Sequence, residues 1–294
     1  MRRKISVALA TALIVSGTIG GTGWAAEWPK QLVMAVTPSN IPTELFKASE
    51  VFAAELGKRV GIPIKVYMPT DYLGVVEALR NQTADMAFVH PAGYVFSNRE
   101  ARAQIVAVDV WHGKTSYTSR IFVRKDAGIK RLEDLRGRTI AFVDPGSTSG
   151  YVYPMVFLMK KGLVKGRDPK TFFKDAMFAG THEAALLALL NGSVDAVASF
   201  DLAPEQYLKE KARIDALAYV AETDLIPEAG MCVREGLDPS LVKKLTEALM
   251  AFNAPEYRSV LKDFYGIDGF APAKDSDYNP VREAIDLLGW RPKP

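Results

Sequence analysis

Short apolar segments and amphipathic segments alternate along most of this chain, and this alternation is the strongest constraint on its fold. Apolar runs of three to seven residues between turn signals are typical of buried strands. The runs that we interpret as strands are 32–36, 64–67, 86–89, 105–108, 119–123, 139–143, 172–178, 196–200, 219–221 and 231–233. Helical patterns separate most of them, which predicts an α/β fold with a largely parallel sheet.

The rhythm of strands and helices starts again after residue 137. We therefore expect two α/β lobes, one formed by residues 26–118 together with 222–294 and the other by 119–221, so that the chain crosses between them twice. Ligands of open α/β sheets bind at the carboxyl ends of strands. With two lobes, this rule predicts a binding site in the cleft between them.

The first 25 residues have the features of a secretory leader. Three basic residues within Met1–Lys4 precede an apolar run at 5–19, and small residues follow up to Ala26. Cleavage after Ala25 is the favoured position. The apolar run is short for a membrane span, so we expect an exported soluble protein that resides in the periplasm.

Charge and cysteine content exclude several classes of function. The 37 basic residues include three in the leader, so 34 remain against 34 acidic ones. A neutral mature chain argues against binding to nucleic acid or to a membrane surface. Cys232 is the only cysteine and lies in an apolar run, which excludes an internal disulfide and favours a buried, inert thiol. We predict no cofactor and no metal ion, and we expect a monomer.

The segment Asp144–Gly150 carries the clearest chemical signal. It follows the predicted strand at 139–143 and precedes an apolar stretch, Tyr151–Leu158, that would begin a helix with Pro154 in its first turn. The patterns GxxxxGK[ST] and GxGxxG do not occur here, which argues against a nucleotide.

Three consecutive hydroxyl residues, Ser147, Thr148 and Ser149, occupy this predicted helix start. Unpaired N–H groups and hydroxyls at the positive end of a helix dipole form a receptor for a small oxyanion. The alternative is that these side chains only cap the helix.

The chain resembles a known family, the periplasmic phosphonate-binding proteins of phosphate/phosphite/phosphonate ABC importers. The resemblance runs from about Leu32 to Pro239 and depends on several short segments in the same order: Pro69–Gly74, Ala84–Phe88, Asp144–Gly150, Gly180–Glu183, Gly192–Asp195 and Ile226–Pro227. It implies a type II periplasmic-binding-protein fold with a two-strand hinge. It also implies capture of a small tetrahedral oxyanion (phosphonate, phosphite or phosphate) for an inner-membrane permease.

The resemblance assigns roles to individual residues. Ser147, Thr148 and Ser149 would grip the oxyanion, and Tyr72 would donate a hydrogen bond from the opposite lobe. His182 would donate to an anion oxygen, which is possible in either protonation state. Neutral donors would thus hold the anion without an arginine.

The chain departs from the family pattern at several positions. Family members that bind an amino-alkyl phosphonate pair its ammonium with acidic residues, but the aligned positions here are Leu202 and Ala229. The neighbouring residues Asp201 and Glu228 could substitute, although we expect both to face solvent. Asp201 stays a candidate ligand residue.

Further candidates surround the predicted cleft. His90, which stands where many members have glycine, is either a new donor or a wall residue. Tyr94 and Tyr117 are candidate wall residues. Ser39 and Asn40, in the first strand-to-helix loop, could offer N–H groups and side-chain donors.

The same residues also suggest other functions. The protein could present its ligand to a membrane histidine kinase, or it could bind another anion such as arsenite. A hydrolytic triad of Ser149, His182 and Asp144 has no GxSxG motif to support it. The spacings of His90, His112 and His182 match no zinc motif. We therefore expect a binding protein and not an enzyme.

Overall fold

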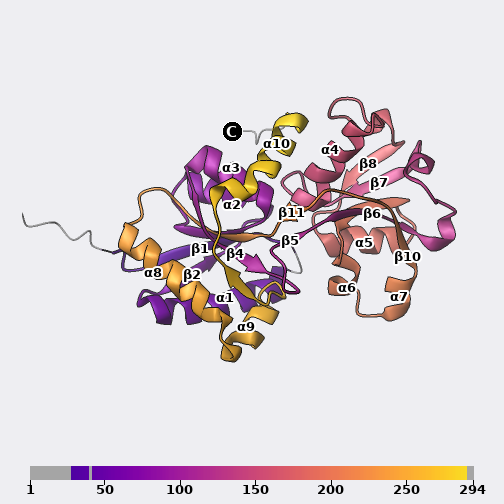
Figure 1. Ribbon diagram of the computed structural model, residues 1–294. Coiled ribbons are helices and arrows are strands. Elements are labelled where there is room, and N and C mark those ends of the chain that lie inside the picture. The colour runs from indigo at the N-terminus through magenta and orange to yellow at the C-terminus, as the bar shows by residue number, and fades with distance from the viewer. Residues whose placement is uncertain (1–27, 40–41, 290–294) are drawn as a thin grey trace, which may run out of the picture.

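The computed structural model describes residues 28–39 and 42–289. They form two lobes, each built on its own β-sheet, and two short strands run between the lobes (Figure 1). The predicted leader at 1–25 and the candidate Asn40 lie outside the described residues. Among the described helices, none combines the length and the apolar character that a membrane span requires.

The first lobe contains the six-stranded sheet, in the order β13-β4-β12-β3-β1-β2. Its strands are β1 (Leu32–Val36), β2 (Ile64–Tyr67), β3 (Met86–Val89), β4 (Gln104–Val110), β12 (Gly230–Val233) and β13 (Gly269–Ala271). The helices that pack in or against this lobe are α1 (Pro42–Val60), α2 (Leu73–Arg80), α3 (Pro91–Ala101), α8 (Pro239–Met250), α9 (Arg258–Asp263) and α10 (Asn279–Leu288).

The second lobe contains the five-stranded sheet, in the order β10-β6-β9-β7-β8. Its strands are β6 (Ser119–Arg124), β7 (Thr139–Phe142), β8 (Asp175–Phe178), β9 (Ala196–Phe200) and β10 (Leu217–Glu222). Its helices are α4 (Tyr153–Lys160), α5 (His182–Leu190), α6 (Ala203–Tyr207) and α7 (Lys211–Asp215).

The connection between the lobes is the short pair β5 (Ser116–Tyr117) and β11 (Ile226–Pro227). These strands are antiparallel, with Ile226 opposite Tyr117 and Pro227 opposite Ser116. One carries the chain out of the first lobe and the other brings it back (Figure 1). The predicted two-lobed fold with a two-strand hinge is confirmed.

The expectation of a largely parallel sheet is only partly correct. β1 is parallel to both β2 and β3, and β7 is parallel to both β8 and β9. However, β12 lies antiparallel between β3 and β4, and β6 lies antiparallel between β9 and β10. Each of these strands directly follows a hinge strand, β5 or β11, and runs in the opposite direction to its two neighbours. Local sequence patterns do not reveal the direction of a strand.

Two predicted boundaries were also wrong, and one strand was missed. The strand predicted at 172–178 begins only at Asp175, because Pro169–Thr171 forms a 3₁₀ turn and the two phenylalanines that follow are buried in the core. The sequence pattern also predicts a helix from Pro204 to Lys211, but α6 ends at Tyr207. β13 was not predicted, because it begins with a glycine and is flanked by Asp268 and Pro272, which are turn residues.

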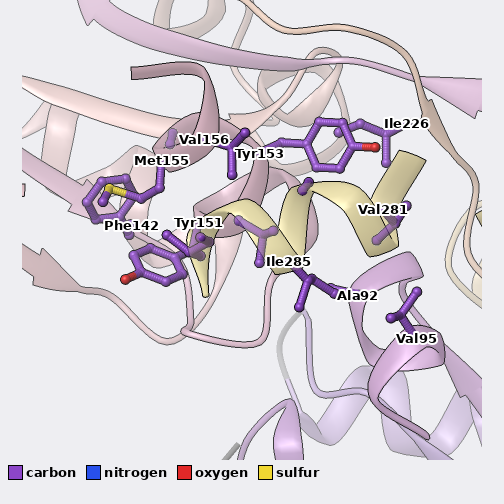
Figure 2. Packing of buried hydrophobic residues seen from close by; sticks show 14 of the residues in the cluster. Ala92, Val95, Phe142, Tyr151, Tyr153, Met155, Val156, Ile226, Val281 and Ile285 are labelled. Carbon is purple, nitrogen blue, oxygen red and sulfur yellow. The ribbon is translucent and has the colours of Figure 1, made fainter. Parts of the chain in front are cut away.

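One hydrophobic cluster joins the lobes, and α10 lies at its centre. Figure 2 shows Val281 and Ile285 of α10 among Ala92 and Val95 of α3 on one side and the buried residues around α4 on the other. The C-terminal helix therefore packs against both lobes at once, and their relative position is fixed partly by apolar burial.

Candidate ligand-binding site

A cavity lies between the lobes, where strand ends of both sheets meet. The centre of a water molecule can occupy about 60 Å³ of it, which is room for a handful of waters and hence for a ligand of only a few heavy atoms. The lining residues are Ser39, Phe88, His90, Asp109, Trp111, Tyr117, Ser147, Thr148, Ser149, His182, Phe200, Gln206, Tyr207, Glu228, Ala229, Tyr265 and Ile267.

The predicted hydroxyl turn lies in the wall of this cavity, and all three hydroxyl residues are buried. The turn does not lead straight into an α-helix, as predicted, but into a π-helical turn, η3 (Thr148–Val152), which precedes α4. The Ser147 hydroxyl accepts a hydrogen bond from the Gly150 N–H at 3.1 Å. The amide groups of Thr148 and Ser149 begin the turn, where N–H groups have no intrahelical partner.

Gly150 allows this turn to pack directly on β7. A Cβ atom at this position would lie 2.5 Å from the Val143 side chain and 2.7 Å from the Ser147 hydroxyl. Any larger residue would therefore push the hydroxyl turn away from the strand that supports it.

Thr148 connects the two lobes across the cavity. Its Oγ1 accepts a hydrogen bond from the Ala92 N–H at 2.8 Å, at the start of α3 in the first lobe. Gly146 of the second lobe also lies close to the side chain of Tyr72, which belongs to the first lobe. These contacts bring the first turns of α3 and η3 to the same cavity, so the positive ends of two helical segments face one volume.

The Tyr72 hydroxyl is buried without a hydrogen-bond partner among the described residues. Its ring packs against the His90 ring with 5.5 Å between centroids. Burial, with smaller contributions from neighbours that include Tyr207 and Asp144, raises the pKa of this phenol well above its usual value. Tyr72 therefore stays protonated at neutral pH and can donate a hydrogen bond beside the cavity.

Both cavity histidines are neutral at physiological pH. Burial lowers the pKa of His90 to about 4. Burial, and then the proximity of His90, lowers the pKa of His182 to about 3. His182 Nδ1 lies 2.6 Å from the Ser199 hydroxyl, and His90 Nε2 is buried without a partner among the described residues. A neutral imidazole keeps one N–H, so each ring can offer a donor without a charge.

Three of the predicted site residues do not line the cavity: Tyr72, which packs against His90, and also Tyr94 and Asp201. The Tyr94 hydroxyl donates to the Asp275 carboxylate at 2.6 Å, and its ring packs against the Tyr278 ring with 4.6 Å between centroids. Asp201 does not line the cavity either. Its carboxylate is placed beside the cavity wall near Glu228, and its Oδ1 has no hydrogen-bond partner among the described residues.

Two cavity carboxylates were not predicted as ligand residues. Asp109 and Glu228 line the cavity with exposed fractions of 4% and 8%, whereas we expected Glu228 to face solvent. Burial raises the pKa of both carboxyl groups, and repulsion from Asp109 and then Asp201 adds to the effect at Glu228. A charged residue inside the apolar run of β4 was the signal for Asp109.

The charge of the remaining wall fits the expected way of holding an anion. Among the described residues that line the cavity, none is lysine or arginine. An oxyanion placed at the Ser147–Ser149 turn would therefore be bound by neutral hydroxyl, phenol, imidazole and amide donors. Hydrogen bonds to a charged acceptor are stronger than those between neutral groups.

The alternative chemistries find no support in the geometry. His182 is hydrogen-bonded to Ser199 and not to Ser149, and the Asp144 carboxylate accepts from the Gly146 N–H at 2.7 Å. A Ser–His–Asp relay is thus not assembled among these residues. Within residues 28–39 and 42–289, no group of three or more His, Cys, Asp and Glu side chains is placed to hold a metal ion.

The chain was compared with known proteins. Residues 34–278 match the model of a family described as "ABC transporter, phosphonate, periplasmic substrate-binding protein". The "Phosphate-import protein PhnD" of Mycolicibacterium smegmatis is 27% identical, over 97% of this chain and 96% of that protein. The "Phosphonates-binding periplasmic protein" of Escherichia coli is 27% identical, over 96% of this chain and 84% of that protein.

A solved structure is similar in fold. It is the binding-protein component of an ABC phosphonate transporter from Pseudomonas aeruginosa, which superposes with a TM-score of 0.80 at 24% identity, over 90% of this chain and 87% of that one. The two relatives differ in the ligand that their names give, phosphate in one and phosphonates in the other. The choice among such ligands therefore depends on the side chains of this particular cavity.

Proposed function

This chain belongs to the family of periplasmic substrate-binding proteins of phosphonate ABC transporters, and we propose that it captures a small tetrahedral oxyanion between its lobes. The ligand class is phosphonate, phosphite or phosphate. The observation that carries the proposal is the hydroxyl turn Ser147–Ser149 at a helix start, buried and facing a cavity of small volume. Such a turn offers several hydrogen bonds to one anion.

We infer that Ser147, Thr148, Ser149, Tyr72 and the two cavity histidines provide the donors. The serine and threonine groups belong to one lobe and Tyr72 and His90 to the other, so a bound anion would be held from both sides. Ligand binding would then favour the closed arrangement, because only that arrangement supplies the full set of donors. A permease in the inner membrane would recognise this closed form, as the family implies.

The proposal also includes where the protein acts and what happens to its ligand. The protein acts in the periplasm, as expected for its family, after a leader is removed near Ala25. We place the lobe boundaries near residues 118 and 222. We propose that the ligand is delivered unchanged to the permease, as expected of a substrate-binding protein of this family.

The direct test is calorimetric titration of the protein with phosphite, methylphosphonate, 2-aminoethylphosphonate and phosphate. We expect at least one of them to bind, and Ser149→Ala to weaken its binding about 10- to 100-fold, the loss of one hydrogen bond to a charged group. Ser97→Ala is the matched control, because this buried hydroxyl on α3 lies outside the cavity and has no partner among the described residues. Equal affinities of both variants, or no binding of any of the four anions, would reject the proposed site.

A further inference from the structure

A second hollow lies where the lobes meet, outside the oxyanion cavity. It is formed by one face of α4, one face of α10 and the segment 223–225, which leads from β10 to the hinge strand β11. The centre of a water molecule can occupy about 130 Å³ of it, against about 60 Å³ in the cavity. We call this hollow the hinge groove. Its lining residues are Tyr153, Val156, Phe157, Lys160, Thr223, Asp224, Leu225, Pro280, Glu283, Ala284 and Leu287.

Much of the surface of the hinge groove is apolar. Val156 of α4 and Ala284 of α10 are buried beneath it, with exposed fractions of 5% and 6%. Leu225 and Leu287 also line the groove, yet 65% and 56% of their surfaces are exposed. Exposed apolar side chains that gather beside a hollow mark a place where a ligand can bury hydrocarbon surface.

The Tyr153 hydroxyl is a polar group of this groove that has no hydrogen-bond partner among the described residues. Only 7% of the residue is exposed. Figure 2 shows its ring extending from α4 towards Ile226 of the hinge strand β11. A buried hydroxyl without a partner costs free energy, so the groove contains an unused hydrogen-bonding group at the hinge.

Two carboxylates of the groove converge on this hydroxyl. Burial, and then the charges of Asp224 and Glu283, raises the pKa of the Tyr153 phenol above its usual value. Neither carboxylate forms an ion pair with a residue in the described part of the chain. Lys160 lies at the other end of α4, about 10 Å from Tyr153 along the helix axis. The end of the groove near Tyr153 is therefore negative.

The charge and the aromatic rings of the groove indicate which ligand it fits. An anion would be repelled by the two carboxylates. A metal ion has too few ligands, since the described residues contain no group of three or more His, Cys, Asp and Glu side chains placed to hold one. An organic cation gains hydrogen bonds to the carboxylates and attraction to the faces of Tyr153 and Phe157. The Phe157 ring already has the Lys161 ammonium 5.5 Å from its centroid.

We propose that the hinge groove is a second binding site, and that its ligand is a small organic ammonium ion with a short apolar chain. The ammonium lies among Asp224, Glu283 and the Tyr153 hydroxyl, which can accept as well as donate a hydrogen bond. The hydrocarbon part covers Leu225 and Leu287. The site is separate from the oxyanion cavity, because the two hollows share no lining residue in the described part of the chain.

The position of the groove couples it to closure of the lobes. α4 belongs to the second lobe, and α10 packs against α3 of the first. Figure 1 shows α4 and α10 on one side of the hinge strands, and α6 and α9 on the other; Gln206 and Tyr207 of α6 line the oxyanion cavity. A rotation about the hinge that closes one side opens the other. A cation that holds the groove open therefore favours the closed cavity, and it raises the oxyanion affinity.

The site is tested on the full mature protein by titrations followed with saturation-transfer NMR. The probes are n-butylammonium and 1-butanol, which have the same carbon chain with and without the charge. We expect butylammonium to bind at least about fivefold more tightly than butanol. The double variant Asp224→Asn/Glu283→Gln should abolish this preference, because it removes both charges. Both residues are exposed, so the variant should fold normally.

Two further variants separate a specific site from general attraction to acidic surface. Tyr153→Phe should weaken butylammonium binding about two- to fivefold, since it removes one hydrogen-bond partner. Glu247→Gln, on the exposed side of α8, removes an acidic charge far from the groove and should leave binding unchanged. Equal effects of Glu247→Gln and of Asp224→Asn/Glu283→Gln would overturn the site.

The coupling rests on the proposed function, and it is measured by calorimetric titration with the oxyanion that binds. Saturating butylammonium should raise the oxyanion affinity about fivefold relative to potassium chloride of equal ionic strength. The double variant should not show this rise. An unchanged oxyanion affinity in the presence of bound butylammonium would overturn the coupling.

The outcomes distinguish the second site from oxyanion capture. Equal affinities for butylammonium and butanol, or a preference that survives the double variant, would overturn the site and leave oxyanion capture intact. A dimer in sedimentation together with no butylammonium binding would mean that a second copy of the chain covers the groove, and the inference would fail. If no oxyanion binds, the proposed function fails, while the titration with butylammonium still decides on the groove.

Discussion

The Tyr72 hydroxyl is a buried donor with no partner among the described residues of the empty protein. Tyr72→Phe should therefore leave the free energy of unfolding unchanged or slightly higher, while it weakens oxyanion binding about 10- to 100-fold. Tyr153→Phe removes another buried hydroxyl without a described partner, beside a different pocket and not against His90, and should not alter affinity. Calorimetry and thermal melts of both variants test this, and equal affinities would remove Tyr72 from the site.

Glu228 makes the stability of the ligand-free protein depend on pH. Burial, and then repulsion from Asp109 and Asp201, raises its pKa well above the usual value of 4.5. Below that value the carboxyl is protonated in both folded and unfolded states, so no penalty exists. As the pH rises toward the folded-state pKa, the unfolded state ionises first and stability is lost.

Glu228→Gln should therefore raise the Tm of the ligand-free protein by about 2–5 °C at pH 7–8 and leave it nearly unchanged at pH 4. Thermal melts followed by circular dichroism across this range measure the difference from the unaltered protein. Glu247→Gln, which is exposed, should show no such trend. A Tm difference that is the same at pH 4 and pH 8 would mean that the Glu228 charge is already compensated.

The hydroxyl turn between β7 and α4 depends on close packing as much as on its donors. Gly150→Ala should lower the free energy of unfolding by about 1–3 kcal/mol and reduce ligand affinity, because the new Cβ would lie 2.5 Å from Val143. Gly93→Ala in α3 is the matched control. Its Cβ would meet Val89 at an ordinary 3.5 Å, so it should be neutral or stabilising by about 0.5–1 kcal/mol. Urea unfolding distinguishes the two, and similar losses would disprove this packing argument.

Individual elements were largely predictable from local pattern. β1, β2, β3 and β9 have the predicted bounds, because each combines an uninterrupted apolar run with clear turn residues. The π-helical turn at Thr148 was not predictable. It forms because Thr148 is held by the Ala92 N–H of the other lobe and Gly150 is pressed on Val143, and neither contact is visible in a linear pattern.

The C-terminal helix α10 couples the two lobes. Ile285 on its buried face is 1% exposed and lies in the cluster that both lobes share (Figure 2). Ile285→Ala should lower the free energy of unfolding by about 2–4 kcal/mol. Leu287, on the same helix, is 56% exposed, so Leu287→Ala should change it by less than about 0.5 kcal/mol. Urea denaturation tests this, and a small effect at Ile285 would show that α10 does not hold the lobes together.

The whole-molecule arrangement also explains which of the predicted residues line the cavity. Ser147, Thr148, Ser149, His182 and His90 all line the cavity, as strand-end positions should in a two-lobed α/β protein. Their contacts with a ligand remain proposals. Tyr94 was misplaced because its hydroxyl is paired with Asp275, 181 positions away in the sequence, and no local pattern indicates that contact.

The sequence by itself determined the alternating α/β architecture, the two lobes, the hydroxyl turn at Ser147–Ser149 and the family, since each of these follows from residues that are neighbours along the chain. Only the tertiary structure decided the antiparallel strands at the hinge, the π-helical turn and the burial of Asp109 and Glu228. Those two carboxylates are 119 positions apart in sequence, and they become one acidic surface only because the hinge strands bring β4 and the return segment together. Burial and mutual repulsion are properties of that closeness, and neither has a counterpart in the linear sequence.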